Sequence, residues 1–232
     1  MNDTEKRRAR RRRKAGKSYT TLDLGGGMEQ ASPDAVLRAM GELPQDLDWE
    51  TMAPNVIPIL PRRRPMPPMA GEPFRVTLPP GIPTGFGIDI GPAFLVVGAS
   101  LLATWPIGPV DLVATALENL RMRVRGVRPR DLVGQTLDSV PVRVLQSGVG
   151  CASALVLVPD ELRRIFGEEP QCFIAPMRDV LISMPADADR AFVAWINEEF
   201  SEMDPNGLAL DAFVLEDGAV RYEALRSQMR LS

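Results

Sequence analysis

The chain has 232 residues, of which 45% are hydrophobic and 25% are charged, as in an ordinary globular protein. It contains no histidine, which excludes Ser-His-Asp and Cys-His catalysis and every zinc or haem site that needs a histidine ligand. Its two cysteines cannot form a Cys₄ zinc site, and we expect them to be free thiols in a reducing, cytoplasmic protein without a cofactor.

The charge is divided unevenly along the chain. Residues 1–17 carry nine basic and two acidic side chains, a balance of +7, whereas the remainder has a balance of -10. No apolar periodicity is visible over residues 1–31, so we expect a disordered basic arm. Such an arm can contact RNA or the ribosome, an anionic membrane surface, or the acidic body of the same chain. The expected polyanion-binding residues are Arg7, Arg8, Arg10, Arg11, Arg12, Arg13 and Lys14.

Residues 32–73 are expected to form a short helix followed by a linker. The run "SPDAVLRAMGEL" predicts a helix with Ser32 as N-cap, Pro33 in the first turn and Gly41 near its end. Residues 54–73 are dense in proline, which favours an extended or polyproline II linker. Within them, "PRRRPMPP" could also dock in an aromatic groove of a partner.

Residues 74–226 are expected to form an α+β domain. The strand candidates are "FRVTL", "AFLVV", "SLLATW", "VPVRVLQ", "ASALVLV", "CFIAP" and "DVLISMP", and Asp217-Gly218 predicts a closing hairpin. The helix candidates are 109–124, 159–166 and 187–203. Because no regular β-α-β alternation appears, we expect a mainly antiparallel sheet with helices packed on one face.

Residues 91–110 form an uncharged stretch about as long as the roughly 20 residues of a membrane-spanning helix. Three prolines and three glycines interrupt this stretch, so two buried strands around a turn explain it better. We therefore expect no transmembrane segment.

The two longest helix candidates have clear apolar faces. In 109–124 the apolar stripe comprises Val113, Ala116, Leu117, Leu120 and Val124. In 187–203 we expect Asp187 to cap the helix and a buried face of Ala188, Phe192, Trp195, Ile196 and Phe200.

The second half of the chain resembles the YtpQ-like family of uncharacterised bacterial proteins. The resemblance rests on "ALENLR" at 116–121, on residues 152–189 with "VPDEL" and "APMRDVLI", and on the hairpin "AFVLEDG". Met177 stands where the family pattern has a small polar residue before Arg178-Asp179, and the basic, proline-rich front lies outside the pattern. The resemblance implies a fold but no activity, because the family has no established function.

The Arg178-Asp179 pair is the sharpest polar candidate, since it lies between two apolar strands. It is either an anion site, in which Asp179 orients Arg178, or a structural turn whose charges satisfy backbone groups. Asn119, in the "ALENLR" helix, could simply bond a neighbouring loop. Cys151 follows a Gly-rich turn, but no histidine can activate it, and Cys172 is expected in the core.

Two functions are compatible with these features. The first is a non-enzymatic binding module, acting on a protein partner or, through its arm, on RNA or the ribosome. The second is an enzyme that uses carboxylates and Arg178 on a small anionic substrate, since general base catalysis by a carboxylate needs no histidine. We expect no metal site in either case.

Overall fold

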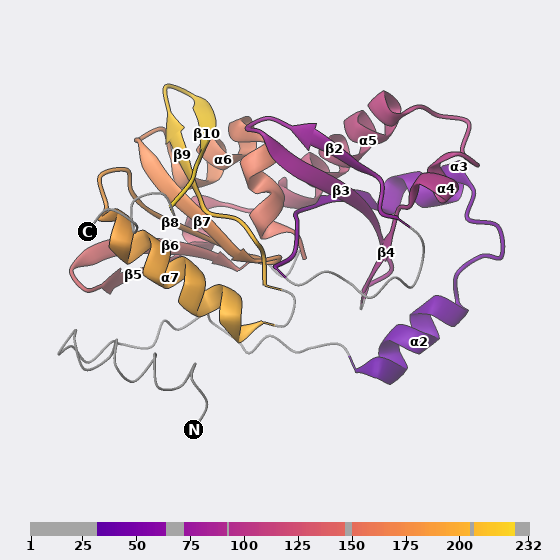
Figure 1. Ribbon diagram of the computed structural model, residues 1–232, viewed down its shortest axis with the longest axis horizontal. Helices are drawn as coiled ribbons and strands as arrows, with labels where there is room; N and C mark the ends of the chain where they lie inside the picture. The colour runs from indigo at the N-terminus through magenta and orange to yellow at the C-terminus, as the bar shows by residue number, and fades with distance from the viewer. Residues whose placement is uncertain (1–31, 64–71, 92, 147–149, 205–206, 226–232) are drawn as a thin grey trace.

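The computed structural model describes residues 32–63, 72–91, 93–146, 150–204 and 207–225. The expected basic arm and its candidate polyanion-binding residues lie outside this range. The described residues form two antiparallel sheets with helices around them, which confirms the α+β class (Figure 1). The smaller sheet has the strand order β1-β3-β2, with β4 also paired to β3, and the larger has the order β10-β9-β7-β8-β6-β5.

The smaller sheet is built around one long strand. It comprises β1 (Val56–Ile59), β2 (Arg75–Leu78), β3 (Ile82–Asp89) and β4 (Phe94–Val96). β2 and β3 form a hairpin, at whose turn Gly81 has a φ of 99°, a value that favours glycine. β1 lies inside the proline-dense segment that we expected to be a linker. Its backbone is extended, as expected, but Val56 and Ile57 are completely buried and the strand pairs with β3.

Four helices come from the same part of the chain as the smaller sheet. They are α2 (Pro33–Gly41), α3 (Trp49–Met52), α4 (Ala99–Leu102) and α5 (Pro109–Val124), and the 3₁₀ turn η1 (Ala53–Asn55) joins α3 to β1. In α2 the Ser32 hydroxyl accepts a hydrogen bond from the Ala35 N–H and caps the helix as predicted. None of the α2 residues is buried, and the helix stands apart from the sheets in Figure 1.

The stretch "SLLATW" was predicted as a strand, but its first three residues belong to the helix α4 and residues 103–105 form the turn after it. The Leu102 N–H donates to the Gly98 carbonyl and the Ala103 N–H to the Ala99 carbonyl, which is the helical pattern. Leu102 and Trp105, three residues apart, are both buried. A short apolar run does not distinguish a strand from a buried helix, and tertiary contacts decided the outcome here.

The larger sheet contains three hairpins. Its strands are β5 (Val133–Leu137), β6 (Val140–Gln146), β7 (Gln171–Met177), β8 (Val180–Pro185), β9 (Ala212–Glu216) and β10 (Ala219–Glu223). The turn between β9 and β10 is the predicted Asp217-Gly218, with φ values of 52° and 75°. The predicted turn between β7 and β8 shifts by one residue, from Met177-Arg178 to Arg178-Asp179.

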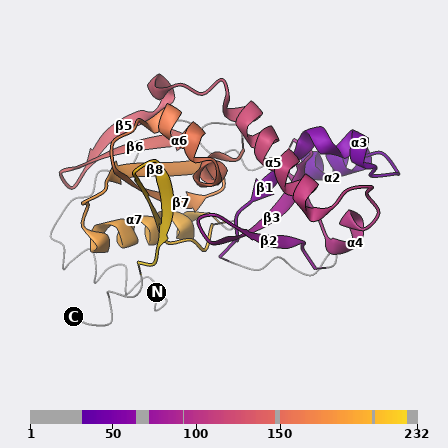
Figure 2. The ribbon, with the colours of Figure 1, turned by 90° about the horizontal axis from the view of Figure 1, so that it is seen from above.

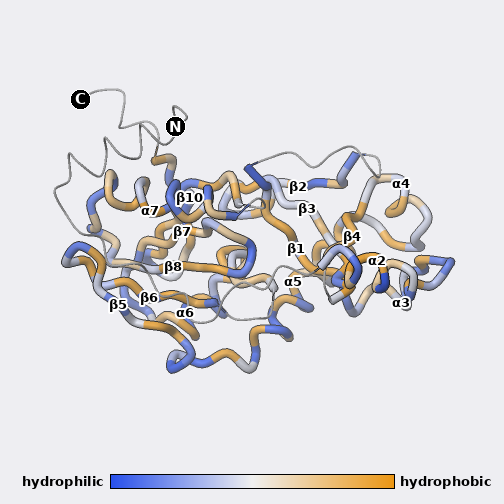
Figure 3. Tube along the Cα trace, turned by 90° about the horizontal axis from the view of Figure 1, so that it is seen from below, coloured by the Kyte–Doolittle hydropathy of each residue, from blue (hydrophilic) through white to orange (hydrophobic). Residues whose placement is uncertain are grey.

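Helical segments cover both faces of the larger sheet, where we had expected one covered face. On one face lies α7 (Arg190–Met203), and on the other lie the 3₁₀ segment η3 (Ala152–Leu157) and α6 (Pro159–Phe166) (Figure 2). A short 3₁₀ turn, η2 (Pro129–Asp131), precedes β5. Figure 3 shows β1 and β8 as nearly continuous hydrophobic segments inside the molecule.

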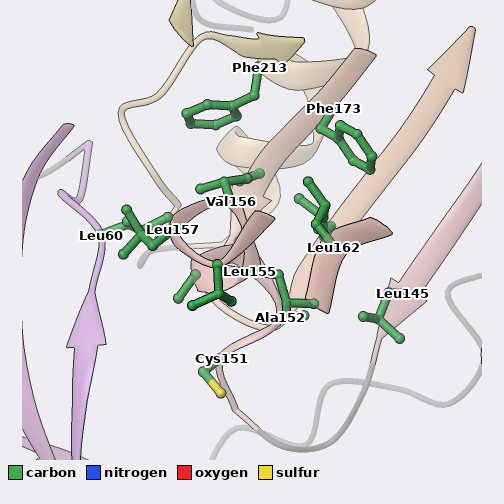
Figure 4. Close-up of a cluster of buried hydrophobic side chains, with 14 of the residues drawn as sticks. Leu60, Leu145, Cys151, Ala152, Leu155, Val156, Leu157, Leu162, Phe173 and Phe213 are labelled. Carbon is green, nitrogen blue, oxygen red and sulfur yellow. The ribbon is translucent and has the colours of Figure 1, made fainter. Parts of the chain in front are cut away.

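The prediction of a strand at "ASALVLV" is wrong, because these residues form η3. All six η3 residues are buried, and the segment fills the space between the larger sheet, α5 and β1. Figure 4 shows Leu157 of η3 beside Leu60, which follows β1, and Phe173 and Phe213 above them. A segment buried on every side has no amphipathic period, so its sequence cannot reveal its conformation.

The two long helices were predicted in nearly the right phase. In α5 the buried residues are Leu112, Ala116, Leu120 and Val124, whereas Val113 and Leu117 of the predicted stripe are only partly buried. The cap of α7 is Asp189 rather than Asp187, since the Asp189 carboxylate accepts from the Ala191 N–H. The buried face of α7 consists of Val193, Ile196, Asn197, Phe200 and Ser201, while Phe192 and Trp195 are only partly buried.

Within the described part of the chain, no helix is both long enough and apolar enough to cross a membrane. The uncharged stretch 91–110 is divided among β4, α4 and the first turn of α5.

Candidate functional site at the junction of the two sheets

A backbone connection joins the two sheets. After β1 the chain runs beside residues 207–209: the Arg63 N–H donates to the Gly207 carbonyl, and the Ala209 N–H donates to the Pro61 carbonyl. The Leu208 N–H in turn donates to the carbonyl of Pro176 in β7. Arg62 forms an isolated β-bridge with Leu208 and is therefore held next to the β7–β8 turn.

The β7–β8 turn contains the predicted pair Arg178-Asp179. Met177 and Val180 face each other in the register, so the two charged residues are the turn itself. The Arg178 carbonyl accepts a hydrogen bond of 3.0 Å from the Ser153 N–H of η3. This bond anchors the backbone of the turn to η3 and involves neither charged side chain of the pair.

The Arg178 side chain lies over an aromatic ring of the other sheet. Its guanidinium carbon is 4.2 Å from the centre of the Phe94 ring in β4, a cation–π contact that crosses from one sheet to the other. Gly150 approaches the same ring: a Cβ added there would lie 3.8 Å from the Phe94 Cζ.

An ion pair between Arg123 and Asp89 lies in the same region. Asp89 is the last residue of β3, and Arg123 is on the last turn of α5, beside the buried Leu120 and Val124. The second oxygen of the Asp89 carboxylate accepts from the Gly91 N–H at 2.8 Å. Both side chains are mostly shielded, with 22% of Arg123 and 18% of Asp89 exposed. This carboxylate is therefore already fully engaged.

Cys151 is a buried residue within electrostatic reach of Asp89, Arg123, Arg178 and Asp179. Its side chain is buried, and burial raises the pKa of the Cys151 thiol to about 12. Burial is the largest cause of this net shift; the Arg123 and Arg178 guanidiniums act to lower the pKa of the thiol, and the Asp179 and Asp89 carboxylates act to raise it. The thiol is therefore neutral at physiological pH and is not a nucleophile.

We call Arg62, Asp89, Arg123, Cys151, Arg178 and Asp179 the junction cluster. Burial lowers the pKa of Arg178, and the nearby Arg62 guanidinium lowers it further against the opposing effect of Asp179 and Asp89. Arg178 nevertheless stays charged, because the ordinary pKa of arginine is above 12.

The pairing of the three arginines in the junction cluster is unequal. Arg123 has Asp89 as its partner, and the carboxylate of Asp204 lies close enough to Arg62 to raise its pKa, although burial has the larger, opposite effect. Within the described residues, the Arg178 guanidinium has the Phe94 ring as its contact and forms neither a hydrogen bond nor an ion pair within 4.0 Å. A half-buried guanidinium with five N–H donors is seldom left in this state.

The Arg178 nitrogens are not sealed inside the protein. The fully buried side-chain atoms without a hydrogen-bond partner in the described part of the chain belong to Gln146, Arg163, Ser183 and Asn197. Because Arg178 is half-buried, its N–H groups can reach an anion arriving from solvent.

The remaining sequence candidates have structural roles. The Asn119 amide donates to the carbonyls of Ala53 and Val56, at 2.6 and 2.8 Å, and so holds η1 and β1 against α5. Its neighbour Glu118 is exposed and pairs with Arg121 on the same helix. Cys172 is buried in β7, which confirms its expected place in the core.

Sequence reasoning identified Arg178, Asp179 and Cys151 but missed Arg62, Asp89, Phe94 and Arg123. Local sequence held no signal for these four, because they come from four different segments that meet only in the fold.

In the described residues, no group of three or more cysteine, aspartate or glutamate side chains is placed to hold a metal ion.

The chain matches no family model, no curated protein and no solved structure. The junction cluster therefore has to be interpreted from its own geometry.

Proposed function

We propose that this protein is a non-enzymatic binding module that recognises an anionic group with Arg178. The observation that carries the proposal is the half-buried Arg178 guanidinium, which stacks on Phe94 and has no acidic partner within ion-pair distance among the described residues. Contact with the ring restricts the guanidinium, and a restricted fork of donors loses less entropy when it binds a two-oxygen anion.

The geometry gives less support to the alternative, an enzyme that acts on a small anionic substrate. Its general base would be a carboxylate of the junction cluster. Both oxygens of the Asp89 carboxylate already accept hydrogen bonds, one from Arg123 and one from the Gly91 N–H, so neither is free to face a substrate. The Cys151 thiol is buried and neutral, so it offers no nucleophile.

A titration of the full-length protein tests the anion site. We expect acetate, phosphate or sulfate at low ionic strength to shift the NMR signal of the Arg178 Nε–H. The Arg178→Gln variant should lose the corresponding binding, whereas Arg130→Gln, which changes an exposed arginine, should retain it. Equal anion binding by both variants would contradict the proposal, and consumption of a small anion by the protein would favour the enzyme.

We also propose that the basic arm binds polyanions such as RNA through charge. The support is the +7 balance of residues 1–17 beside the -10 balance of the remainder. Binding that releases counterions weakens steeply as salt rises. RNA and anionic vesicles should therefore bind the full-length chain at low salt, and a variant that begins at Ser18 should bind them far less. Similar binding by the two proteins would overturn the role of the arm.

Membership of the YtpQ-like bacterial family is a further proposal, and so is a cytoplasmic location. The motifs behind the family proposal occupy α5, the run from η3 to β8, and the β9–β10 hairpin, so they include the Arg178-Asp179 turn. The cytoplasmic proposal rests on the two free thiols. Detection of the protein in fractionated cells would test the location.

A further inference from the structure

We infer that the anion recognised by Arg178 is a singly charged carboxylate rather than a phosphate. This inference rests on the proposed anion site and specifies the chemical class of its ligand. It follows from the balance of charge around Arg178 and from the number of N–H donors that are left for a ligand.

The charges around Arg178 leave little net positive charge for a ligand to neutralise. The junction cluster holds three arginines and two aspartates, and the Arg123 charge is already cancelled by Asp89. Arg62 lies within electrostatic reach of Asp204. The Arg178 guanidinium is the cation of the cluster without an acidic group within 4.0 Å in the described residues. When Asp204 and Asp179 are counted, three aspartates stand against the three arginines, so a ligand with one negative charge disturbs the balance less than a ligand with two.

A dianion would be less well accommodated. Asp89 and Asp179 both act electrostatically on Arg178, so a second negative charge would be placed close to two carboxylates. In a half-buried site this repulsion is screened less than at an open surface. Phosphate at neutral pH carries more than one negative charge, because its second pKa is about 6 to 7.

The available donors point to the same class of ligand. The Arg178 guanidinium contacts the Phe94 ring and donates no hydrogen bond among the described residues, so its N–H groups remain for the ligand. One guanidinium edge matches two oxygens of a carboxylate or of a phosphate, but only the phosphate has further oxygens that need donors of their own. Arg123 is engaged by Asp89 and offers little to those oxygens.

Competitive titrations of the full-length protein test the inference at pH 7.5 and fixed ionic strength. The ligands are acetate, the blocked tripeptide acetyl-Gly-Glu-Gly-amide and inorganic phosphate. Acetate represents a free small molecule, and the peptide represents the acidic side chain of a protein partner. Only binding that Arg178→Gln removes and Arg130→Gln retains is assigned to the site, which separates it from binding by the basic arm.

We expect at least one carboxylate ligand to bind the site about tenfold more tightly than phosphate. This is the change in Kd expected when one ligand makes a single unfavourable contact with a charged group and the other does not. Asp179→Asn should strengthen phosphate binding more than acetate binding, because it removes a repelling charge. If Arg178→Gln unfolds, Arg178→Lys keeps the charge without the planar fork and should weaken carboxylate binding severalfold.

The outcomes separate the two proposals. Phosphate binding that depends on Arg178 and equals or exceeds carboxylate binding would overturn the carboxylate inference and leave the anion site standing. An equal effect of Asp179→Asn on both ligands would also overturn it. Binding of all three ligands that is unaffected at position 178 would overturn the anion site itself.

Discussion

At the scale of single residues, Asn119 and Arg178 show how similar sequence signals can have different meanings. Each is a polar residue beside apolar neighbours. The Asn119 amide is satisfied by two backbone carbonyls of the protein itself, so it serves the fold. Arg178 has a ring as its partner and no acidic group within ion-pair distance in the described residues. The distinction depends on partners that are distant in the sequence.

Replacing Asn119 should destabilise the protein. Asn119→Leu keeps the volume but leaves the Ala53 and Val56 carbonyls without their donor, which costs about 1–3 kcal/mol in the free energy of unfolding. Glu118→Ala, on the exposed side of the same helix, should change it by less than about 0.5 kcal/mol. Urea unfolding measures both variants, and equal effects would show that the Asn119 hydrogen bonds contribute nothing.

The buried Cys151 thiol should make stability fall at alkaline pH. Its pKa is raised from 9.0 to about 12 in the folded protein, so the unfolded chain releases the proton first. The stabilisation by the neutral thiol is complete below pH 9 and is lost as the pH rises from 9 towards 12.

Urea unfolding of the wild type and of Cys151→Ala measures this contribution. Between pH 7 and pH 10 the wild type should lose about 1 kcal/mol more than Cys151→Ala, because only the wild type carries the titrating thiol. Equal losses in the two proteins would show that the thiol ionises as readily in the fold as in the unfolded chain.

At the scale of elements, α7 shows how a helix can be predicted with its boundary misplaced. Two aspartates precede α7, Asp187 and Asp189, and each could begin the helix because aspartate is a good N-cap. In the structure the Asp189 carboxylate bonds the Ala191 N–H, and the Ala188 N–H donates to Pro185 within the preceding turn. The end of β8 therefore decided which aspartate caps the helix.

The two aspartates should differ when they are replaced. Asp189→Ala should cost about 1 kcal/mol, the usual value for the loss of a helix cap. The exposed Asp187 makes no cap, and Asp187→Ala should stay within about 0.5 kcal/mol of the wild type. Thermal or urea unfolding distinguishes them, and a larger effect at position 187 would place the cap where the sequence predicted it.

The buried face of α7 gives a second prediction at this scale. Ile196 is completely buried against the larger sheet, so Ile196→Ala should cost about 2–5 kcal/mol. Trp195 is only partly buried and lies 6.1 Å, between ring centres, from Phe192. Trp195→Ala should therefore cost less than the roughly 3–5 kcal/mol of a fully buried aromatic residue. A greater loss from Trp195→Ala than from Ile196→Ala, measured by urea unfolding, would reverse this assignment.

At the scale of the whole molecule, the two sheets share one core. Ile57 and Leu60 from the β1 region, Leu120 of α5 and the η3 residues belong to the same buried cluster as Phe173 and Phe213 of the larger sheet. The backbone connection through residues 61–63 and 207–209 adds hydrogen bonds to this contact. We therefore expect the two sheets to unfold together.

Limited digestion with thermolysin tests where the cooperative unit begins. The exposed Leu37 and Met40 of α2 should be cleaved early, since no α2 residue is buried. The lasting fragment should begin before α3 and retain β1, because Met52 and Val56 are in the core. Mass spectrometry identifies the fragment, and one that begins after Ile59 would show that β1 is dispensable.

The sequence by itself determined the elements whose signals are local. The Asp217-Gly218 turn, the proline at the start of α5, the glycine after α6 and the N-cap of α2 each fix a backbone conformation within a few residues. Only the tertiary structure decided β1, α4 and η3, because an apolar run gains burial energy in any conformation that its neighbours allow. It also decided the junction cluster, whose charges come from separate segments and acquire partners only when the two sheets meet.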